Sequence, residues 1–246
     1  MNKRTAVVTG GIGGLGTAIC IALARAGRRV VAADLGGHPE RVARFEAEVD
    51  GLDVRFAPLD VADFDACGEF VRGIEAAGEG PDILVNAAGI TRDTTLRKMD
   101  RAQWESVLSV NLDSVFNLCR HAIEGMTGRG FGRIVNISSV NGQTGQFGQT
   151  NYSAAKAGMH GFTMALAREV ARKGVTVNSV SPGYCETALV AAIPDDIRQG
   201  IVDKVPVGRL GHPGEIARTV EFLSADDAGY ITGANIPVNG GLYMGF

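Results

Sequence analysis

A tyrosine and a lysine four residues apart, Tyr152 and Lys156, are the side chains of this sequence best suited to acid–base chemistry. They stand near the start of a long helical pattern, and a spacing of four places both on one face of a helix. A phenol has an ordinary pKa of about 10 and is a poor proton carrier at neutral pH. A neighbouring ammonium stabilises the phenolate, so we expect Lys156 to lower the pKa of Tyr152 and the pair to transfer a proton.

Two further polar residues precede this pair. Ser139 follows a predicted strand at residues 133–138, where its hydroxyl is suited to hydrogen-bond a carbonyl oxygen of a substrate. Asn111 lies on the preceding predicted helix, where its amide is suited to hold a relay water. Each of the four residues also has a structural interpretation, since tyrosine is often buried, lysine solvated, serine in turns and asparagine at helix caps. Their combination favours the catalytic interpretation.

The glycine-rich string TGGIGGLG directly follows a predicted strand and opens an apolar helical pattern at residues 15–26. Glycine permits a tight turn and close backbone approach, and the N-terminus of a helix attracts a phosphate group. No Lys-Ser or Lys-Thr pair follows, which disfavours the phosphate-binding loop of nucleoside triphosphatases. The string predicts a dinucleotide site that uses Gly10, Gly13, Gly14, Leu15 and Gly16.

A carboxylate closes the second predicted strand. Asp34 stands where dinucleotide-binding folds place an acid on the adenosine ribose diol, and this position favours NAD(H) as the cofactor. A 2′-phosphate there would meet a like charge, although the nearby Arg41 and His38 would soften the repulsion and leave NADP(H) as the alternative. The structural interpretation of Asp34 is a solvated residue that begins the turn at Gly36 and Gly37.

Short apolar runs alternate with helix-length segments along the whole chain. Such runs are typical of parallel strands buried on both faces, because the connecting helices cover the sheet. We therefore predict an α/β fold, a Rossmann-type doubly wound parallel sheet of about seven strands, in a single domain spanning residues 1–246, with a helical lid over the substrate at 184–206. Pro237 lacks a backbone donor, which places the last strand at a sheet edge. The predicted strands are 6–9, 29–34, 53–60, 83–86, 133–138, 175–181 and 234–239.

Composition disfavours several other classes of protein. The net charge of −3 offers no broad attraction to nucleic acid or to anionic membranes, and no apolar run is long enough to span a bilayer. No secretory signal precedes the first strand, so we expect a cytoplasmic protein. Neither the cysteines nor the histidines show the spacing of a metal site, so we expect no metal and reduced, buried thiols at Cys20, Cys67, Cys119 and Cys185.

The ordered motifs TGGIGGLG, NAAG, Asn111, Ser139 and YSAAK resemble the short-chain dehydrogenase/reductase family along the whole chain. The resemblance implies that Tyr152 protonates the carbonyl oxygen, that Lys156 binds the nicotinamide ribose and that Ser139 orients the substrate. It also implies further cofactor contacts at Asp60, Val61, Ala88, Gly89, Tyr152, Pro182, Gly183 and Thr187. One departure is Ala87, where the family usually has a second asparagine, and a side-chain contact is lost there.

Within this family, the stretch GQFGQTNYS and the segment GITRD resemble the acetoacetyl-CoA reductases, which make (R)-3-hydroxybutanoyl-CoA for polyhydroxyalkanoate synthesis. The resemblance implies a CoA thioester as substrate and a homotetramer. The alternatives are a 3-oxoacyl-carrier-protein reductase and, more distantly, a non-catalytic dinucleotide sensor. The residues expected to line the substrate path, unless they form an ordinary polar loop, are Asp93, Ser139, Gln146, Phe147, Gln149 and Tyr184.

Overall fold

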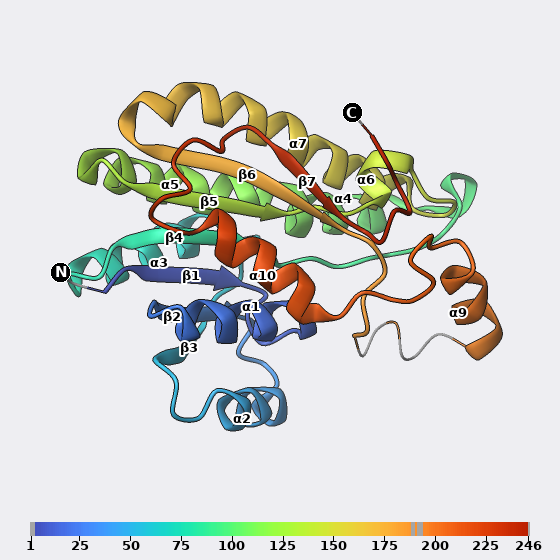
Figure 1. Ribbon diagram of the computed structural model, residues 1–246, viewed down its shortest axis with the longest axis horizontal. Coiled ribbons are helices and arrows are strands. Elements are labelled where there is room, and N and C mark those ends of the chain that lie inside the picture. The colour runs from blue at the N-terminus through green and yellow to red at the C-terminus, as the bar shows by residue number, and fades with distance from the viewer. Residues whose placement is uncertain (1–2, 188–189, 191–193, 246) are drawn as a thin grey trace.

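Seven parallel strands form one sheet at the centre of the structure, a computed structural model that describes residues 3–187, 190 and 194–245 (Figure 1). The strand order is β3-β2-β1-β4-β5-β6-β7, so the chain begins in the middle of the sheet and builds outward in both directions. This is the predicted doubly wound arrangement. The strands are β1 (Thr5–Thr9), β2 (Arg29–Asp34), β3 (Val54–Pro58), β4 (Pro81–Asn86), β5 (Gly132–Ile137), β6 (Val175–Pro182) and β7 (Asn235–Val238).

The last strand lies at the edge, as its proline predicts. Pro237 is exposed and lies opposite Ser181 of β6, the strand with which β7 pairs. Proline has no N–H to donate to the hydrogen bonds between strands, so it weakens a sheet least when its strand lies at the edge. Strand β5 ends at Ile137, one residue before the predicted end, so Ser138 separates Ser139 from the strand.

Helices cover both faces of the sheet (Figure 1). One face carries α1 (Gly14–Arg25), α2 (Pro39–Glu48) and α10 (Pro213–Leu223). The other carries α3 (Phe64–Ala76), α5 (Ser114–Arg129) and α7 (Thr150–Val170). Shorter elements lie near the carboxyl ends of the strands or extend the long helices: η1 (Leu96–Lys98), α4 (Arg101–Leu108), η2 (Ser109–Asp113), α6 (Asn141–Thr144), η3 (Ala171–Lys173) and α9 (Asp195–Val202).

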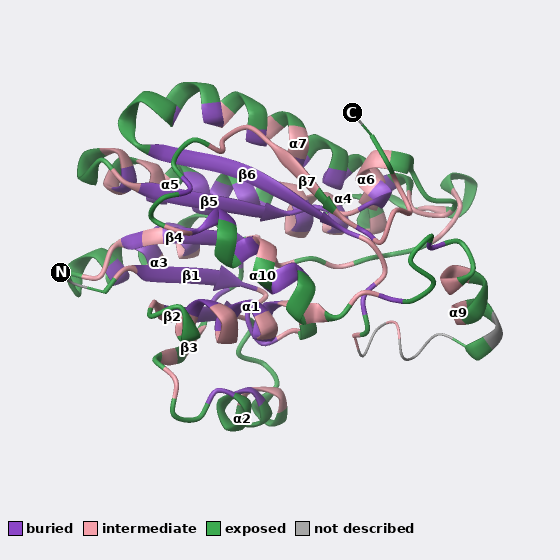
Figure 2. Ribbon diagram, viewed as in Figure 1, coloured by how far each residue is buried: buried purple, intermediate pink, exposed green. Residues whose placement is uncertain are grey.

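Two hydrophobic cores lie on the two faces, and alternate residues of each strand belong to one or the other. In β1, Ala6 and Val8 pack on the side of α1 and α10, whereas Val7 packs on the side of α3, α5 and α7. This is the period of two that a strand imposes on its side chains. Figure 2 shows the central strands buried almost along their full length, which explains why their sequences are continuously apolar.

The four cysteines are buried, which confirms their predicted place in the core. No helix among the described residues combines the length and apolar character needed to cross a membrane. The predicted lid at 184–206 falls partly on residues 188–189 and 191–193, which lie outside the described residues. Helix α9, at the C-terminal end of this segment, lies beyond the carboxyl edge of the sheet (Figure 1).

Candidate active site

The glycine-rich turn forms a backbone cradle between β1 and α1. Gly10 has a φ of +64°, and a side chain there would approach the carbonyl oxygen of Ala87 to 2.9 Å. A side chain at Gly16 would collide with the carbonyl oxygen of Gly10. The glycines therefore let the turn fold tightly beneath the helix N-terminus, and this bare cradle fits a pyrophosphate. Leu15 packs against the core, which leaves only its backbone for a cofactor.

The loops after β4 and β6 border the same cradle. The Thr9 hydroxyl accepts hydrogen bonds from the backbone amides of Ala87 and Ala88, at 3.0 and 3.1 Å, and thereby holds the NAAG loop against β1. On the other side, a Cβ at Gly14 would lie 3.2 Å from the Thr187 methyl group. The turn at Pro182 and Gly183 ends β6 at this edge. The predicted cofactor residues on separate strands are thus brought to one edge of the sheet.

Asp34 and Asp60 lie at the neighbouring ends of β2 and β3. Asp34 Oδ1 accepts from the Leu35 amide at 2.8 Å, and its Oδ2 lies 4.0 Å from the Arg41 guanidinium. A cavity of about 470 Å³ opens between Leu35, Asp60 and Phe70 and has the position and apolar wall expected for an adenine ring. Val61 is buried in the core, so it offers its backbone instead of its side chain.

Tyr152 and Lys156 lie on one face of α7, with Lys156 Nζ 5.6 Å from the centroid of the tyrosine ring. The ammonium donates to the carbonyl oxygen of Ile137 at 2.8 Å, at the end of β5. Lys156 is only 3% exposed, and burial lowers its pKa to about 7. Burial therefore makes this lysine easier to deprotonate than a solvated one.

The effect of this lysine on Tyr152 differs from the sequence expectation. Burial raises the pKa of the Tyr152 phenol above its ordinary value, a hydrogen bond with Ser139 lowers it, and nearby Asp93 and Tyr184 raise it further. The expected net lowering of this pKa is therefore wrong for the protein by itself. The physical reason is that burial penalises a phenolate, while the Lys156 ammonium is turned to a backbone carbonyl.

Asn111 lies in η2, a π-helical segment between α4 and α5 instead of a regular helix. Its amide nitrogen donates to Val107 and Ile90 carbonyl oxygens at 2.8 and 2.9 Å, which fixes the side chain. Its Oδ1 is buried and has no hydrogen-bond partner among the described residues. A Cβ on Gly89 would lie 2.7 Å from this oxygen and 3.6 Å from Lys156 Nζ, so both groups approach one point. An orphaned acceptor there suits a water between the two residues.

Three of the expected substrate residues meet in one polar wall. Gln149 Nε2 donates to Asp93 Oδ2 at 2.8 Å, and Gln149 Oε1 accepts from Asn141 Nδ2 at 2.9 Å. Burial raises the pKa of the Tyr184 phenol, which Asn141 and Asp93 also affect, so Tyr184 lies near these groups. Asp93 lies after β4, Gln149 at the start of α7 and Tyr184 after β6, so the wall joins three separate segments.

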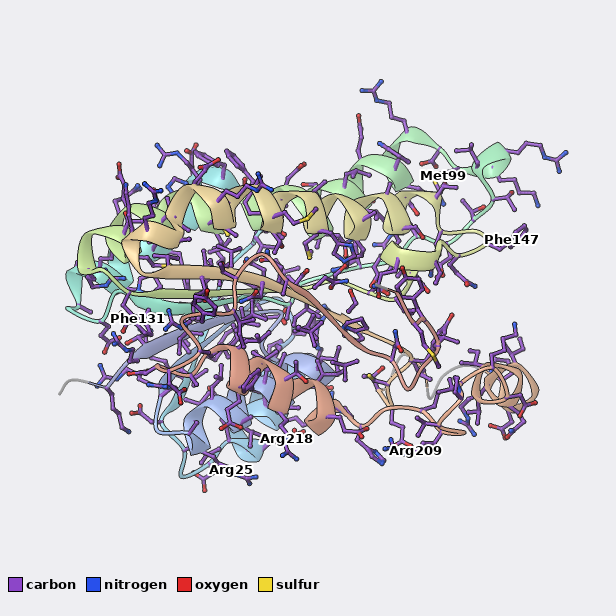
Figure 3. The ribbon with its side chains drawn as sticks, turned by 45° about the horizontal axis from the view of Figure 1, so that its top comes forward. Arg25, Met99, Phe131, Phe147, Arg209 and Arg218 are labelled. Atoms are coloured by element: carbon purple, nitrogen blue, oxygen red, sulfur yellow. The ribbon has the colours of Figure 1, made fainter. Side chains whose placement is uncertain are left out.

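Two other expected substrate residues lie apart from this wall. Gln146 and Phe147 are exposed on the loop between α6 and α7, and the Phe147 side chain reaches 87% exposure (Figure 3). The structure instead adds Asn141, which sequence reasoning missed. Its backbone amide donates to Ser139 Oγ at 3.1 Å while its side chain binds Gln149. The only signal in the sequence was the position of Asn141 two residues after Ser139, and no hydrophobic periodicity marked this residue.

Among the residues that the structure describes, no group of three or more His, Cys, Asp or Glu side chains is placed to hold a metal ion. The arrangement is instead a backbone cradle for a dinucleotide beside a phenol, a hydroxyl and a buried lysine. A family model described as enoyl-(acyl carrier protein) reductase matches residues 10–243. The chain belongs to the short-chain dehydrogenase/reductase family, which confirms the resemblance seen in its motifs.

Curated relatives cover essentially the full chain. An acetoacetyl-CoA reductase of Allochromatium vinosum is 56% identical over 98% of this chain and 99% of that protein. An acetoacetyl-CoA reductase of Cupriavidus necator is 53% identical over the whole of both chains. A 3-oxoacyl-[acyl-carrier-protein] reductase of Pseudomonas aeruginosa is 42% identical over 99% of both. Among solved structures, a putative gluconate dehydrogenase from Agrobacterium tumefaciens superposes with a TM-score of 0.92, at 35% identity and over 97% of this chain and 95% of that one.

Proposed function

We propose that the protein is an acetoacetyl-CoA reductase that forms (R)-3-hydroxybutanoyl-CoA with NADH, as a step toward polyhydroxyalkanoates. The observation that carries the proposal is a chain of hydrogen bonds that joins Asp93 to Gln149, Gln149 to Asn141, and Asn141 to the Ser139 hydroxyl. It supplies hydrogen-bonding groups for a thioester arm next to a proton donor. The two relatives above 50% identity that bear this name, matched over the full chain, support the same substrate.

Tyr152 is the proposed proton donor to the ketone oxygen of the substrate. Its raised pKa keeps the phenol protonated and therefore able to donate in the reductive direction. The Ser139 hydroxyl binds the same ketone oxygen and holds it against the phenol. The nicotinamide cofactor supplies the hydride.

Lys156 and Asn111 act behind the phenol. Lys156 Nζ is positioned to bind the nicotinamide ribose, and its pKa of about 7 lets it exchange a proton at neutral pH. Asn111 offers its orphaned Oδ1 to a water beside Lys156, and this water restores the proton that Tyr152 gives away. The lowered pKa of Lys156 therefore favours transfer of a proton back to Tyr152.

NADH is the proposed cofactor because of Asp34. Its carboxylate is suited to accept from both ribose hydroxyls and to repel a 2′-phosphate. The turn glycines, together with the loops that hold Asp60, Gly89 and Thr187, would hold the remaining parts of the dinucleotide. Arg41 lies within 4.0 Å of Asp34 and reduces the repulsion without removing the carboxylate.

The 42% identity to a 3-oxoacyl-[acyl-carrier-protein] reductase supports a second candidate, reduction of the same 3-oxoacyl group on a carrier protein. The two substrates share the phosphopantetheine arm and differ in what lies beyond it. Comparing kcat/KM for acetoacetyl-CoA and for the acetoacetyl carrier-protein thioester separates them. An inert CoA ester beside an active carrier ester would establish the second candidate and overturn the first.

The acid–base role is tested by Tyr152→Phe. Removing the hydroxyl should lower kcat for acetoacetyl-CoA by about 10²–10⁴-fold, because general acid catalysis contributes that much. The dissociation constant for NADH, measured by fluorescence, should stay close to the wild-type value, since the cradle is backbone. Undiminished turnover would remove Tyr152 from the mechanism.

We also propose a cytoplasmic homotetramer with one domain per chain and a lid formed around α9. Support for the assembly comes from apolar groups exposed on two surfaces. One carries the stacked rings of Phe64 and Phe116, at a centroid distance of 5.9 Å, and the other lies near the C-terminal edge strand with Phe222 and Tyr230. Light scattering of the purified chain tests the tetramer, and a monomer at micromolar concentration would contradict it.

A further inference from the structure

A chain of side-chain hydrogen bonds lies between helix α7 and the edge strand, apart from the polar wall described above. His160 follows Lys156 by one helical turn on α7, and its Nε2 lies 3.3 Å from the Ser181 hydroxyl at the end of β6. The Ser181 hydroxyl donates to Asn235 Oδ1 at 2.8 Å, and the Ser179 hydroxyl donates to the same oxygen at 3.2 Å. Side chains on α7, β6 and β7 are therefore joined in one network.

The direction of these hydrogen bonds follows from the number of hydrogen atoms available. A hydroxyl has one hydrogen, and Ser181 gives its hydrogen to Asn235 Oδ1, so Ser181 Oγ accepts from His160. His160 must therefore carry a proton on Nε2. Burial lowers the pKa of this imidazole, and the charge of Lys156 lowers it further. The ring is therefore neutral at mildly alkaline pH, with its Nδ1 unprotonated.

Ser181 directly precedes the turn at Pro182 and Gly183, which lies at the carboxyl edge of the sheet. Backbone contacts fix this turn on two sides. The Val140 amide donates to the Pro182 carbonyl oxygen at 2.8 Å, and the Gly183 amide donates to the Val238 carbonyl oxygen at 3.0 Å. The buried Ser181 side chain adds a connection to α7, the helix of the proposed acid–base pair. The contact with His160 therefore helps to set the distance between the turn and this helix.

The strand order decides which half of the cofactor this turn would contact. The proposed adenosine site lies at the ends of β2 and β3, and strands β1, β4 and β5 lie between it and β6. A dinucleotide that runs along the carboxyl edge from Asp34 therefore reaches the turn at Pro182 and Gly183 with its nicotinamide half.

We propose that His160 is a positioning residue that holds this turn against α7 through the Ser181 hydroxyl and thereby places the nicotinamide ring beside Tyr152. The inference rests on the proposed function for the path of the cofactor. Because the adenosine half of the cofactor would lie several strands away, the network should affect binding of the nicotinamide half alone.

Binding of two ligands to the variant His160→Leu tests the inference. NADH carries the nicotinamide ring, whereas ADP-ribose has the same adenosine, pyrophosphate and second ribose without that ring. Loss of one hydrogen bond should weaken NADH binding about three- to tenfold, while the dissociation constant of ADP-ribose should stay within about twofold of the wild-type value. Equal losses for the two ligands would indicate a merely structural role and overturn the inference, as would an unchanged affinity for NADH.

Two further variants are matched controls. His160→Gln keeps a side-chain N–H donor that can reach Ser181, so it should bind NADH within about twofold of the wild type. Ser179→Ala removes the second donor to Asn235 Oδ1 and leaves the contact between His160 and Ser181 in place, so it should bind NADH equally well. A loss in either variant as large as that in His160→Leu would overturn the inference.

A double-mutant cycle tests whether His160 acts through Ser181. In a Ser181→Ala background the hydroxyl is absent, so His160→Leu should weaken NADH binding by less than about a further twofold. Additive effects of the two substitutions would overturn the inference.

The tautomer of His160 gives a measurement that does not depend on ligand binding. The chain has four histidines, so ¹⁵N-labelled histidine gives few NMR signals, and His160→Gln assigns one set of them. At mildly alkaline pH the ring of His160 should be neutral with its proton on Nε2. A proton on Nδ1 would mean that Nε2 accepts from Ser181, and this result would overturn the inference.

The same measurements separate this inference from the proposed function. A wild-type chain that is inert toward acetoacetyl-CoA, but shows the expected difference between NADH and ADP-ribose, would count against the proposed function alone. If the chain binds NADPH in place of NADH, the comparison uses NADPH and 2′-phospho-ADP-ribose, and only the proposed choice of cofactor is overturned.

Discussion

The proposed cofactor side and the proposed substrate side of this site are built in different ways. The cofactor cradle consists of backbone, with Gly10 and Gly16 admitted because a side chain would strike the neighbouring chain. The substrate wall consists of side chains on three segments, whose order of donors and acceptors is set by Asp93. A site built from backbone requires that certain positions carry no side chain. A wall built from side chains requires instead that specific hydrogen-bonding partners be present.

This difference predicts different responses to mutation. In the cradle, any side chain displaces the turn itself, so one methyl group should affect both folding and binding. In the wall, an amide or carboxyl exchange preserves the shape and changes only the hydrogen bonds. The predictions below test this contrast, beginning with the largest expected effect.

The substitution Gly16→Ala should have the largest effect. Its Cβ would collide with the Gly10 carbonyl oxygen and lie 2.9 Å from Gly11 Cα, and neither is a flexible side chain that can move aside. We expect NADH affinity to fall by at least about a hundredfold and the melting temperature to fall as well. The added methyl group can be accommodated only if the backbone of the turn moves, and this movement both strains the fold and displaces the amides that would bind the cofactor. Fluorescence titration with NADH measures the loss.

The control for Gly16→Ala is Gly37→Ala, where an added Cβ meets no atom of the described residues within 4 Å. This variant should bind NADH within about twofold of the wild type, since surface changes usually cost little. Similar losses in the two variants would contradict the idea that the cradle is specified by steric exclusion.

The substitution Asp34→Ala should have an intermediate effect on cofactor choice. It removes an acceptor for the ribose and a charge that repels a 2′-phosphate, and it releases Arg41, 4.0 Å away, to bind that phosphate. The ratio of kcat/KM for NADPH to that for NADH should rise about tenfold or more. Arg41→Ala should move the same ratio in the opposite direction, and a ratio unaffected by both would remove Asp34 as the selector.

The last prediction concerns stability and pH at Lys156. Burial lowers its pKa to about 7 in the folded protein, against about 10.4 in an unfolded chain, so the unfolded state binds more protons between these values. The contribution of this lysine to stability therefore increases as the pH rises from about 7 to 10. Lys156→Met lacks this titration and should be an inactive variant.

Melting temperatures of the wild type and Lys156→Met at pH 6, 8 and 10 measure this contribution. The difference should shift in favour of the wild type by about ten degrees as the pH rises from 6 to 10, because a pKa lowered by about three units corresponds to about 4 kcal/mol and each kcal/mol shifts the melting temperature by about 2–4 °C at this length. The loss of the hydrogen bond to Ile137 is common to all three pH values and cancels in the comparison. A constant difference would mean that Lys156 keeps an ordinary pKa.

Much of the fold was predictable because it follows from local patterns. The β-branched runs predicted all seven strands to within a few residues, and Pro237 marked the edge strand. Glycine spacing located the cradle, and Tyr152 with Lys156 followed from helical periodicity. In each case the information lies in residues close together in the chain, and the backbone geometry of strands and helices converts it directly into position.

The net effect of burial on ionisation was not predictable in the same way. Sequence spacing predicted that Lys156 would lower the Tyr152 pKa, but spacing does not report that the lysine is buried and turned to Ile137. Nor does it report that η2 widens into a π-helical turn at Asn111, which leaves one amide oxygen without a partner. Solvation and competing partners depend on segments far away in the chain.

The amino-acid sequence by itself determined the doubly wound sheet, the glycine cradle and the helical pairing of a phenol with a lysine, because each is encoded by periodicity or by conformational freedom over a few residues. Only the tertiary structure decided that Asn141 joins Ser139 to Gln149, and that an acid after β4 orients amides near α6 and α7. Hydrogen bonds between distant segments depend on distances of a few tenths of an ångström, and these are fixed only when the strands and helices have packed together.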